Sequence, residues 1–425
     1  MAIYRTEVLE ALGQGAAQVV DVSSNVSPGT TDMTAFIQAQ LTASTAGKIC
    51  VLPGGIFKTT STLVMPAGSR LVGDPRSTYD EYGSGSVIYF RPSANTVAIR
   101  NAASAADILV QDIGIDSASY SHSGFSFDVT SSVTMRNIGF HGNFDIGVHV
   151  GAGDVLEMDE LTFFECGIKR AAIYIGGGNA ITVRKLHTSG LAIETAGTDT
   201  AYGIAVGGVS AARSVTISDC IFQGLTIGIG LCRVNAVNID NPYFEETLCN
   251  VRTGDPTISI DSRSIVFNGG SYTATSTHAQ HASRGPLIYL VRARTATFNT
   301  PNFLNSVEDD AILQPIFCDV TTNNVVVINP YFYDSAVPGA GAPLRTNLFM
   351  QSTGSPSPSI TGIGIPYGTN GAHELILKKD GAYGGTSYGL RIDTSGTVST
   401  TAFTPPTYAA PNALLTAAMP SLATI

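Results

Sequence analysis

Charged residues are scarce in this 425-residue sequence, of which they make up 13%. Such a low content argues against coiled coils, helical bundles and charge-rich disorder. The net charge of −10 comes without a basic cluster, so nucleic acid is not an expected partner. No apolar run approaches the ~18 residues of a membrane span. The first ten residues, MAIYRTEVLE, hold no apolar signal-peptide core, so we expect a protein that is neither exported by the general route nor inserted into a membrane.

Cysteine is also sparse, and the six cysteines form no CxxC pair: Cys50, Cys166, Cys220, Cys232, Cys249 and Cys318. This spacing favours buried thiols in a reducing compartment over disulfides. What the chain has in abundance is glycine (45 residues), with many Ser, Thr and Asn, which is typical of turn-rich β structure. The length exceeds one ordinary compact domain unless the architecture is elongated.

One ten-residue phrase occurs twice with its apolar letters kept, as VTMRNIGFHG at 133–142 and VTISDCIFQG at 215–224. Its first eight residues align nine times along the chain, and we take the sixth residue of each copy as its anchor. The copies are 108–115, 133–140, 156–163, 181–188, 215–222, 237–244, 265–272, 296–303 and 325–332, and the anchors are Ile113, Ile138, Leu161, Leu186, Cys220, Pro242, Gly270, Pro301 and Pro330.

The polarity pattern is the same in all copies. Apolar residues stand five and three positions before every anchor, and Phe or Tyr stands two positions after it in seven of the nine copies. Alternation with a period of two predicts a strand with one buried face. The residue just before the anchor is Asn, Asp or Gly in six copies, which predicts a tight bend. Each copy therefore predicts a strand, a bend and a second strand.

A third short strand is predicted after several copies, at 146–150, 172–175, 202–206, 227–230 and 287–291. Three strands per repeat of 22 to 34 residues predict a parallel β-solenoid, whose turns stack like side chains ~4.8 Å apart. A β-propeller is the alternative, but its blades need ~40 or more residues.

Three phrases precede the repeats. They contain Thr31, Asp32, Thr34, Ile37 and Gln38; then Val51, Leu52, Pro53, Gly55 and Phe57; then Leu63, Pro66, Gly68, Leu71 and Gly73. Here the chain resembles the pectate-lyase-like right-handed parallel β-helix proteins, which include bacteriophage tailspikes, over roughly residues 18–340. The resemblance implies an all-β fold of about nine or more rungs with an N-terminal capping helix, which Asp32 or Thr31 would begin. It says little about function, because the family holds lyases, hydrolases and non-catalytic binders.

Four segments are expected. Residues 1–18 form an N-terminal segment or docking peptide, 19–107 the cap and first coils, and 108–340 the regular β-helix. Residues 341–425 break the repeat and contain short strands, turns and a Pro-containing tail. They form either a small β foot that intertwines three chains or a plain C-terminal cap.

The predicted third strands carry small residues at alternate positions, such as Gly147, Ala172, Gly203 and Gly228. One interpretation is a groove in which a sugar chain lies against the backbone, with Tyr174 as its platform and His149 beside it. The alternative is that the small residues only ease close stacking of the rungs.

Carboxyl pairs suit glycosidic hydrolysis, which needs two groups ~5–5.5 Å apart for retention and ~6.5–9.5 Å apart for inversion. Neighbouring rungs supply either separation. The stretch NSVEDDAILQP (305–315) resembles the D-D-x-I stretch of polygalacturonase-type hydrolases. That resemblance implies that one of Asp309 and Asp310 is a general acid and that the other helps to activate water. The family's G-H-G and R-x-K are missing downstream, and a solvated acidic loop is the alternative.

Glu245 and Glu246, two copies earlier, are candidates to complete the carboxyl pair. His278, His281 and Arg284, in the intervening loop, are candidates for binding an anionic sugar, or else surface residues. Arg252 could supply the cation that a polysaccharide lyase needs. HAQH is also a weak metal pattern that lacks a third ligand, so we expect no metal and no cofactor.

The residues and the resemblance together predict a tailspike-like protein that binds and hydrolyses a bacterial surface polysaccharide. The alternatives are a polysaccharide lyase and a non-catalytic carbohydrate-binding or structural spike. The resemblance further implies a homotrimer on a virion tail, made in the bacterial cytoplasm and attached to tail or baseplate proteins through its N-terminus.

Overall fold

The computed structural model describes residues 18–19, 30–44, 49–74, 85–103, 107–189, 192–193, 201–208, 210–254, 260–274, 287–305, 316–319, 321–334, 349–351, 360–363, 366–367, 372–377, 387–392 and 398–403. The chain divides into two compact units, here called unit 1 (Met1–Glu194) and unit 2 (Thr195–Thr424). No helix in the described ranges is long and apolar enough to cross a membrane.

Unit 1 contains one helix and a series of strands. These are β1 (Gln18–Val19), α2 (Thr34–Ala43), β2 (Ile49–Val51), β3 (Gly55–Thr59), β4 (Leu63–Met65), β5 (Arg70–Val72), β6 (Ser86–Phe90), β7 (Val97–Asn101), β8 (Ile108–Ala118), β9 (Ser123–Phe164), β10 (Gly167–Ile175), β11 (Ile181–Arg184), β12 (His187–Ser189) and β13 (Ala192–Ile193).

Unit 2 continues in the same manner. Its parallel strands are β14 (Tyr202–Val206), β15 (Ala212–Ser218), β16 (Ile221–Gln223), β17 (Ile227–Leu231), β18 (Val234–Asp240), β19 (Tyr243–Glu245), β20 (Cys249–Thr253), β21 (Ser262–Asn268), β22 (Ser271–Ala274), β23 (Ile288–Leu290), β24 (Ala293–Asn299), β25 (Asn302–Asn305), β26 (Ile316–Cys318), β27 (Asn323–Ile328), β28 (Tyr331–Asp334), β29 (Phe349–Gln351) and β30 (Ile360–Ile363).

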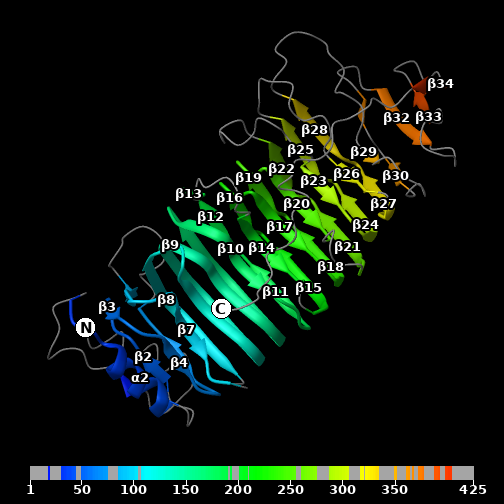
Figure 1. Cartoon of the computed structure of the whole chain (residues 1–425). Coiled ribbons are helices and arrows are strands. Elements are labelled where there is room, and N and C mark those ends of the chain that lie inside the picture. The colour runs from blue at the N-terminus through cyan, green and yellow to red at the C-terminus, as the bar shows by residue number, and fades with distance from the viewer. Residues whose placement is uncertain are drawn as a thin grey trace. The chain divides into compact units, whose positions relative to one another are not determined.

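Each turn of the chain visits three parallel sheets, so the fold is an all-β parallel β-helix. In unit 2 the first-strand sheet runs β15, β18, β21, β24, β27, β30; the second-strand sheet runs β16, β19, β22, β25, β28; and the third-strand sheet runs β14, β17, β20, β23, β26, β29. Figure 1 shows the first of these, from β15 to β27, side by side. The predicted repeat is confirmed, and β20, β26 and β29 are third strands that the sequence analysis missed.

The bend inside each copy is made by a residue with left-handed backbone conformation. All nine positions before the anchors have positive φ, between 45° at Asn329 and 64° at Gly269. Asn, Asp and Gly adopt this conformation at the least steric cost, as the sequence predicted. A second set of positive-φ residues stands directly before the first residue of seven copies, from Asp107 to Asn324. In these seven copies the chain therefore has a left-handed residue at two places.

The interior is filled by side chains that stack from rung to rung. Phe140 and Phe163 lie parallel with ring centroids 4.1 Å apart, and Phe267 and Phe298 with centroids 4.4 Å apart. In unit 2 a longer stack continues through four rungs, made of Phe222, Phe244, Tyr272 and Phe303. Phe140, Phe163 and the four residues of the longer stack are the aromatic residues predicted two positions after the anchor, whereas Phe267 and Phe298 stand three positions before theirs; all are buried.

The N-terminal helix α2 packs on β4 through a side-chain amide. Gln38 Nε2 donates to the Val64 carbonyl at 2.8 Å, and the Val64 N–H donates to Gln38 Oε1 at 2.7 Å. Ile37 and Leu41 are buried beneath the helix. Asp32 Oδ1 accepts a hydrogen bond from the Thr34 N–H at 3.0 Å, so Asp32 satisfies the first amide of the helix. The predicted capping helix is therefore present.

All six cysteines are buried free thiols, as predicted. Burial raises the pKa of the Cys50 thiol to about 12. Since the thiolate is the reactive form, these cysteines contribute to packing rather than to chemistry.

The C-terminal part contains a separate four-stranded antiparallel sheet. Its strands are β31 (Pro366–Tyr367), β32 (Ala372–Leu377), β33 (Ser387–Ile392) and β34 (Val398–Phe403). Parallel pairing continues past residue 340 through β29 and β30, and the antiparallel sheet begins only at Pro366. The use of this sheet as a trimerisation foot stays a prediction.

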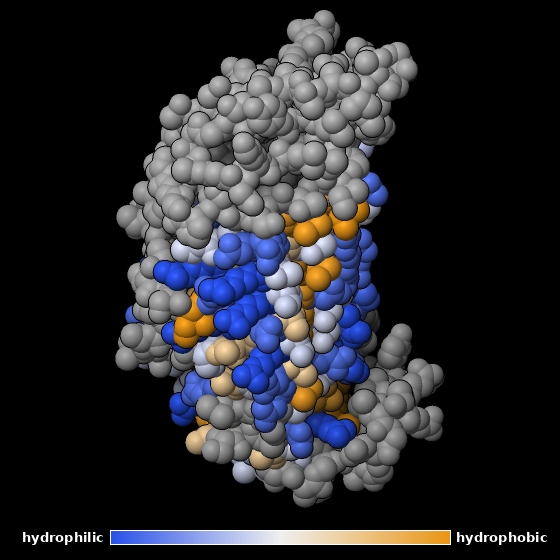
Figure 2. Space-filling model, turned by 90° about the vertical axis from the view of Figure 1, so that its right-hand side faces the viewer, coloured by the Kyte–Doolittle hydropathy of each residue, from blue (hydrophilic) through white to orange (hydrophobic). Residues whose placement is uncertain are grey.

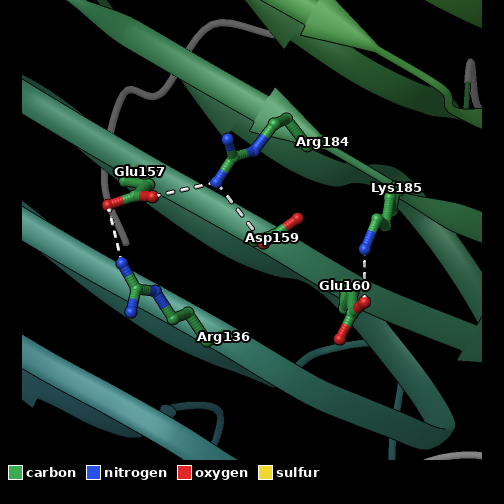
Figure 3. Close-up of polar contacts among 6 residues, drawn as sticks. All are labelled: Arg136, Glu157, Asp159, Glu160, Arg184 and Lys185. Atoms are coloured by element: carbon green, nitrogen blue, oxygen red, sulfur yellow. Dashed lines mark hydrogen bonds and ion pairs between the residues drawn. The ribbon is translucent and has the colours of Figure 1, made fainter.

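Ion pairs join neighbouring rungs on the outer face of the first-strand sheet in unit 1 (Figure 3). Glu157 binds Arg136 of the preceding rung at 3.2 Å and Arg184 of the next rung at 3.0 Å. Lys185 Nζ lies 2.6 Å from Glu160 Oε1. In unit 2 the amides of Asn268 and Asn299 continue this kind of contact, with Asn299 Nδ2 donating to Asn268 Oδ1 at 2.8 Å. Hydrophilic residues dominate the described part of the face in Figure 2, with smaller hydrophobic patches between them.

We predict that Thr300→Asn stabilises the protein. Thr300 has φ 49°, a conformation that is costly for a β-branched residue, whereas Asn occupies the equivalent position before the prolines at 242 and 330. The free energy of unfolding should rise by about 1 kcal/mol, measured by thermal or denaturant unfolding. The reverse change, Asn329→Thr, should lower it by a similar amount, and equal stabilities of all three proteins would contradict this account.

Candidate functional site

The side chains on the outer face of the second-strand sheet in unit 2 form two rows. Within each copy the aromatic residue two positions after the anchor points inward. Its two neighbours, one and three positions after the anchor, therefore point outward. The first of these positions forms an outer row of register partners, and the other forms a second row beside it. The outer row is Ile221, Tyr243, Ser271, Asn302 and Tyr331, and the second row is Gln223, Glu245, Thr273 and Leu304.

Large apolar side chains gather in the outer row. Ile221 is 36% exposed, Tyr243 39% and Tyr331 54%. These are three of the six large hydrophobic side chains that are exposed among the described residues. Single exposed apolar residues are ordinary, but three in one row make this row the candidate surface for contact with another molecule.

Glu245 lies next to one of these rings. The Tyr243 hydroxyl donates a hydrogen bond to Glu245 Oε2, with 3.3 Å between the two oxygens. Partial burial, the charge of Glu245 and this hydrogen bond together raise the pKa of Tyr243, so the phenol stays a donor at neutral pH. Glu245 itself is half-buried and reaches the surface. The face therefore places a carboxylate beside an exposed aromatic ring.

Glu246 differs from its neighbour in backbone conformation. Its φ is 54°, which makes it the left-handed residue of the turn that follows β19. Of the other predicted site residues, Asp309, Asp310, His278, His281 and Arg284 lie outside the described residues, and their roles stay predictions.

The expectation that Tyr174, His149 and Arg252 are exposed to a substrate is wrong. Their exposed fractions are 1%, 6% and 1%. His149 and Tyr174 are register partners in unit 1 with ring centroids 5.9 Å apart. His149 Nδ1 lies 2.9 Å from the Ser126 hydroxyl. In unit 2, Arg252 Nη1 donates to the Tyr202 hydroxyl at 3.1 Å. These polar side chains pair within buried layers and leave no face for a polymer.

The small residues of the third strands serve the aromatic stack, not a groove. A Cβ added at Gly203 would lie 2.5 Å from the Phe222 ring, and one added at Gly228 would overlap the Phe244 ring. A Cβ at Gly147 would overlap the Phe163 ring and lie 2.6 Å from the Ala172 carbonyl oxygen. The glycines therefore make room for interior rings, which supports the alternative interpretation of this pattern.

We predict that Gly147→Ala lowers the free energy of unfolding by about 2–3 kcal/mol, because the added methyl group overpacks the ring stack. In a Phe163→Leu background the same change should cost at least about 1 kcal/mol less, since the smaller side chain can move. Denaturant unfolding of the four proteins of this double-mutant cycle measures the difference. An equal cost in both backgrounds would show that the ring is not the reason for the glycine.

We predict an acid-dependent loss of stability through His149. Burial lowers the pKa of His149 to about 4, from an ordinary 6.5. The folded state thus favours neutral imidazole, and its contribution is present above pH 6.5 and lost as the pH falls towards 4. The loss is on the order of 3 kcal/mol. His149→Asn, which can keep the bond to Ser126, should flatten the dependence of melting temperature on pH in that window; an unchanged slope would contradict the prediction.

Unit 1 holds a second cluster on the outer face of its second-strand sheet, which the sequence analysis did not identify. Asp116 binds Arg91 with 2.5 Å between Oδ1 and Nη2, and the Arg91 guanidinium lies 3.4 Å from the centroid of the Tyr89 ring. His141 is the register partner of Asp116 on the next rung. Asp116, His141 and Glu245 all stand three positions after an anchor, so the aligned copies contained this signal.

The charge of Asp116 is already balanced by Arg91. Asp145, another acid of unit 1, accepts a hydrogen bond from Arg170 Nε at 2.6 Å on the next rung. Both pairs are largely buried and fix neighbouring rungs to each other. Glu245, by contrast, is bonded to a neutral phenol. It is therefore the described carboxylate that is better placed to meet a substrate.

Known structures with the same fold were found, although no protein-family model and no curated protein matches the chain. The pre-mature gene product 12 of bacteriophage phi29 has a TM-score of 0.57 at 12% identity, over 86% of this chain and 58% of that one. A mutant tailspike of E. coli bacteriophage HK620, in complex with a pentasaccharide, has a TM-score of 0.56 at 12% identity, over 84% and 66%.

The A-module of the mannuronan C-5 epimerase AlgE6 from Azotobacter vinelandii has a TM-score of 0.50 at 14% identity, over 81% of this chain and 98% of that one. The chain thus spans less than two thirds of the length of the two phage proteins. At these identities the likeness establishes the fold, and the predicted resemblance to the pectate-lyase-like β-helix proteins is confirmed at that level.

Proposed function

We propose that this chain is a phage tailspike-like protein that binds a bacterial surface polysaccharide on the outer face of the second-strand sheet of unit 2 and depolymerises it. The observation that carries the proposal is the outer row, in which Tyr243 and Tyr331 are exposed and Glu245 is bonded to Tyr243. Aromatic rings with a polar tip suit the contact with a sugar, which has an apolar ring face and polar edges.

Two of the structural neighbours support a carbohydrate ligand. The HK620 tailspike mutant is in complex with a pentasaccharide, and the AlgE6 module belongs to a mannuronan epimerase. Both share the fold of this chain, at 12% and 14% sequence identity. Assembly as a homotrimer and attachment to a virion tail through the N-terminus belong to the same proposal.

We favour hydrolysis as the reaction. Glu245 would serve as one of the two carboxyls that flank the scissile bond, and Asp309 or Asp310 would supply the other. A polysaccharide lyase is the alternative, because one structural neighbour is a mannuronan epimerase. The burial of Arg252, the candidate cation for a lyase, makes this alternative the weaker one.

The test compares Glu245→Gln with the wild-type protein on capsular and lipopolysaccharide polymers from bacteria that the protein binds. We expect binding to persist while the release of new reducing ends falls 10²- to 10⁴-fold, the usual range for the loss of an acid or base. Asp219→Asn is the matched control, since it also replaces an acid by its amide. Asp219 has left-handed backbone just before its anchor, where other copies have Asn, so the fold should tolerate the change.

An undiminished rate in Glu245→Gln would exclude Glu245 from the chemistry. Products with a double bond, detected by their ultraviolet absorbance, would show that the reaction is that of a lyase and not hydrolysis. Binding without any shortening of the polymer would favour the non-catalytic spike.

A further inference from the structure

We infer that the polymer bound on this face is an uncharged polysaccharide that lies along the helix axis from Tyr243 to Tyr331. The inference rests on the proposed function and narrows the class of its ligand. It follows from the spacing of the outer row and from the charge beside it.

The spacing of the outer row sets the direction of the polymer. Tyr243 pairs with Ser271, Ser271 with Asn302 and Asn302 with Tyr331, so each step is one rung. Three steps of ~4.8 Å place the two tyrosines ~14 Å apart, perpendicular to the strands. Short polar side chains stand between two exposed rings. A linear chain can therefore stack on both tyrosines and give its hydroxyl groups to the residues between them.

Ile221 extends the row by one rung on the other side of Tyr243. It is 36% exposed and offers an apolar contact without a hydrogen-bonding tip. The row thus has an apolar end and a polar middle, as expected for a ligand whose ring faces are apolar and whose edges carry hydroxyl groups.

The charge beside the row selects an uncharged polymer. In the described part of the two rows, the charged side chain is the carboxylate of Glu245. A uronate or sialate carboxylate held on the Tyr243 ring would lie close to it, and two like charges at 4 Å repel by ~1 kcal/mol even in bulk water. The hydroxyl groups of a neutral sugar can instead donate hydrogen bonds to the same carboxylate.

The experiment uses the full chain and polysaccharide extracted from bacteria that the fluorescently labelled protein binds. The extract is separated by anion exchange into uncharged and acidic fractions, and binding to each is measured by titration calorimetry. We expect the uncharged fraction to bind. Tyr243→Ala and Tyr331→Ala should each weaken that binding about tenfold. Ile260→Ala is the matched control, since Ile260 is 49% exposed away from the row.

The outcomes separate the inference from the function on which it rests. Binding of the acidic fraction alone would overturn the uncharged class and leave the proposed function intact. A failure to bind any bacterium or either fraction would overturn the proposed function itself. Unchanged binding by both tyrosine variants would show that the polysaccharide does not bind at this row and would overturn the inference. A fall in assembly mass by light scattering in Tyr331→Ala, with binding unchanged, would make the row a contact between copies of the chain and overturn the inference.

Discussion

Left-handed backbone conformation at one position in each repeat is the constraint on which the β-helix depends. The nine residues before the anchors all adopt it, including residues with unfavourable side chains such as Lys185 and Thr300. If one of them relaxed to an extended conformation, the second strand would leave its sheet and its interior aromatic side chain would leave the stack. The small cost of strain at each bend is thus offset by the stacking of rings such as Phe140 on Phe163.

The same bend determines which side chains face the solvent. Because it fixes the phase of the second strand, the residues one and three positions after the anchor point outward in each copy. In unit 1 these positions hold Asp116 and His141, bound into the wall of the helix, whereas in unit 2 they hold Tyr243, Glu245 and Tyr331 at the surface. One backbone geometry therefore supports a closed polar wall in one unit and an accessible binding face in the other.

The sequence predicted the repeat, the bends and the interior stack because these depend on local alternation, which the letters display directly. It misjudged Tyr174 and His149, because it took the wrong phase of the alternation as outward: they share the phase of Gly147 and Ala172, and an added Cβ at Gly147 meets the interior ring of Phe163. Arg252 is buried as well. The sequence analysis selected Glu245 because it is an acid. It could not predict the hydrogen bond between Glu245 and Tyr243, because that requires knowing that both side chains lie on the same face of the strand. Asp116 and Glu245 stand at the same position of the aligned copies, but the residue type at that position varies from copy to copy, so the apolar pattern did not single it out.

Three of the glycines opposite the aromatic stack lie sixteen residues from the ring that they face, and Gly203 lies nineteen residues from Phe222. Gly124 faces Phe140, Gly147 faces Phe163 and Gly228 faces Phe244, each across the interior of its own rung. At the next rung of unit 1 the ring is replaced by Thr188, and the glycine by Ala172. Volume is thus conserved within a rung and not at a single position, so mutations in such a chain would be accepted in pairs, a larger residue on one strand together with a smaller residue on the other.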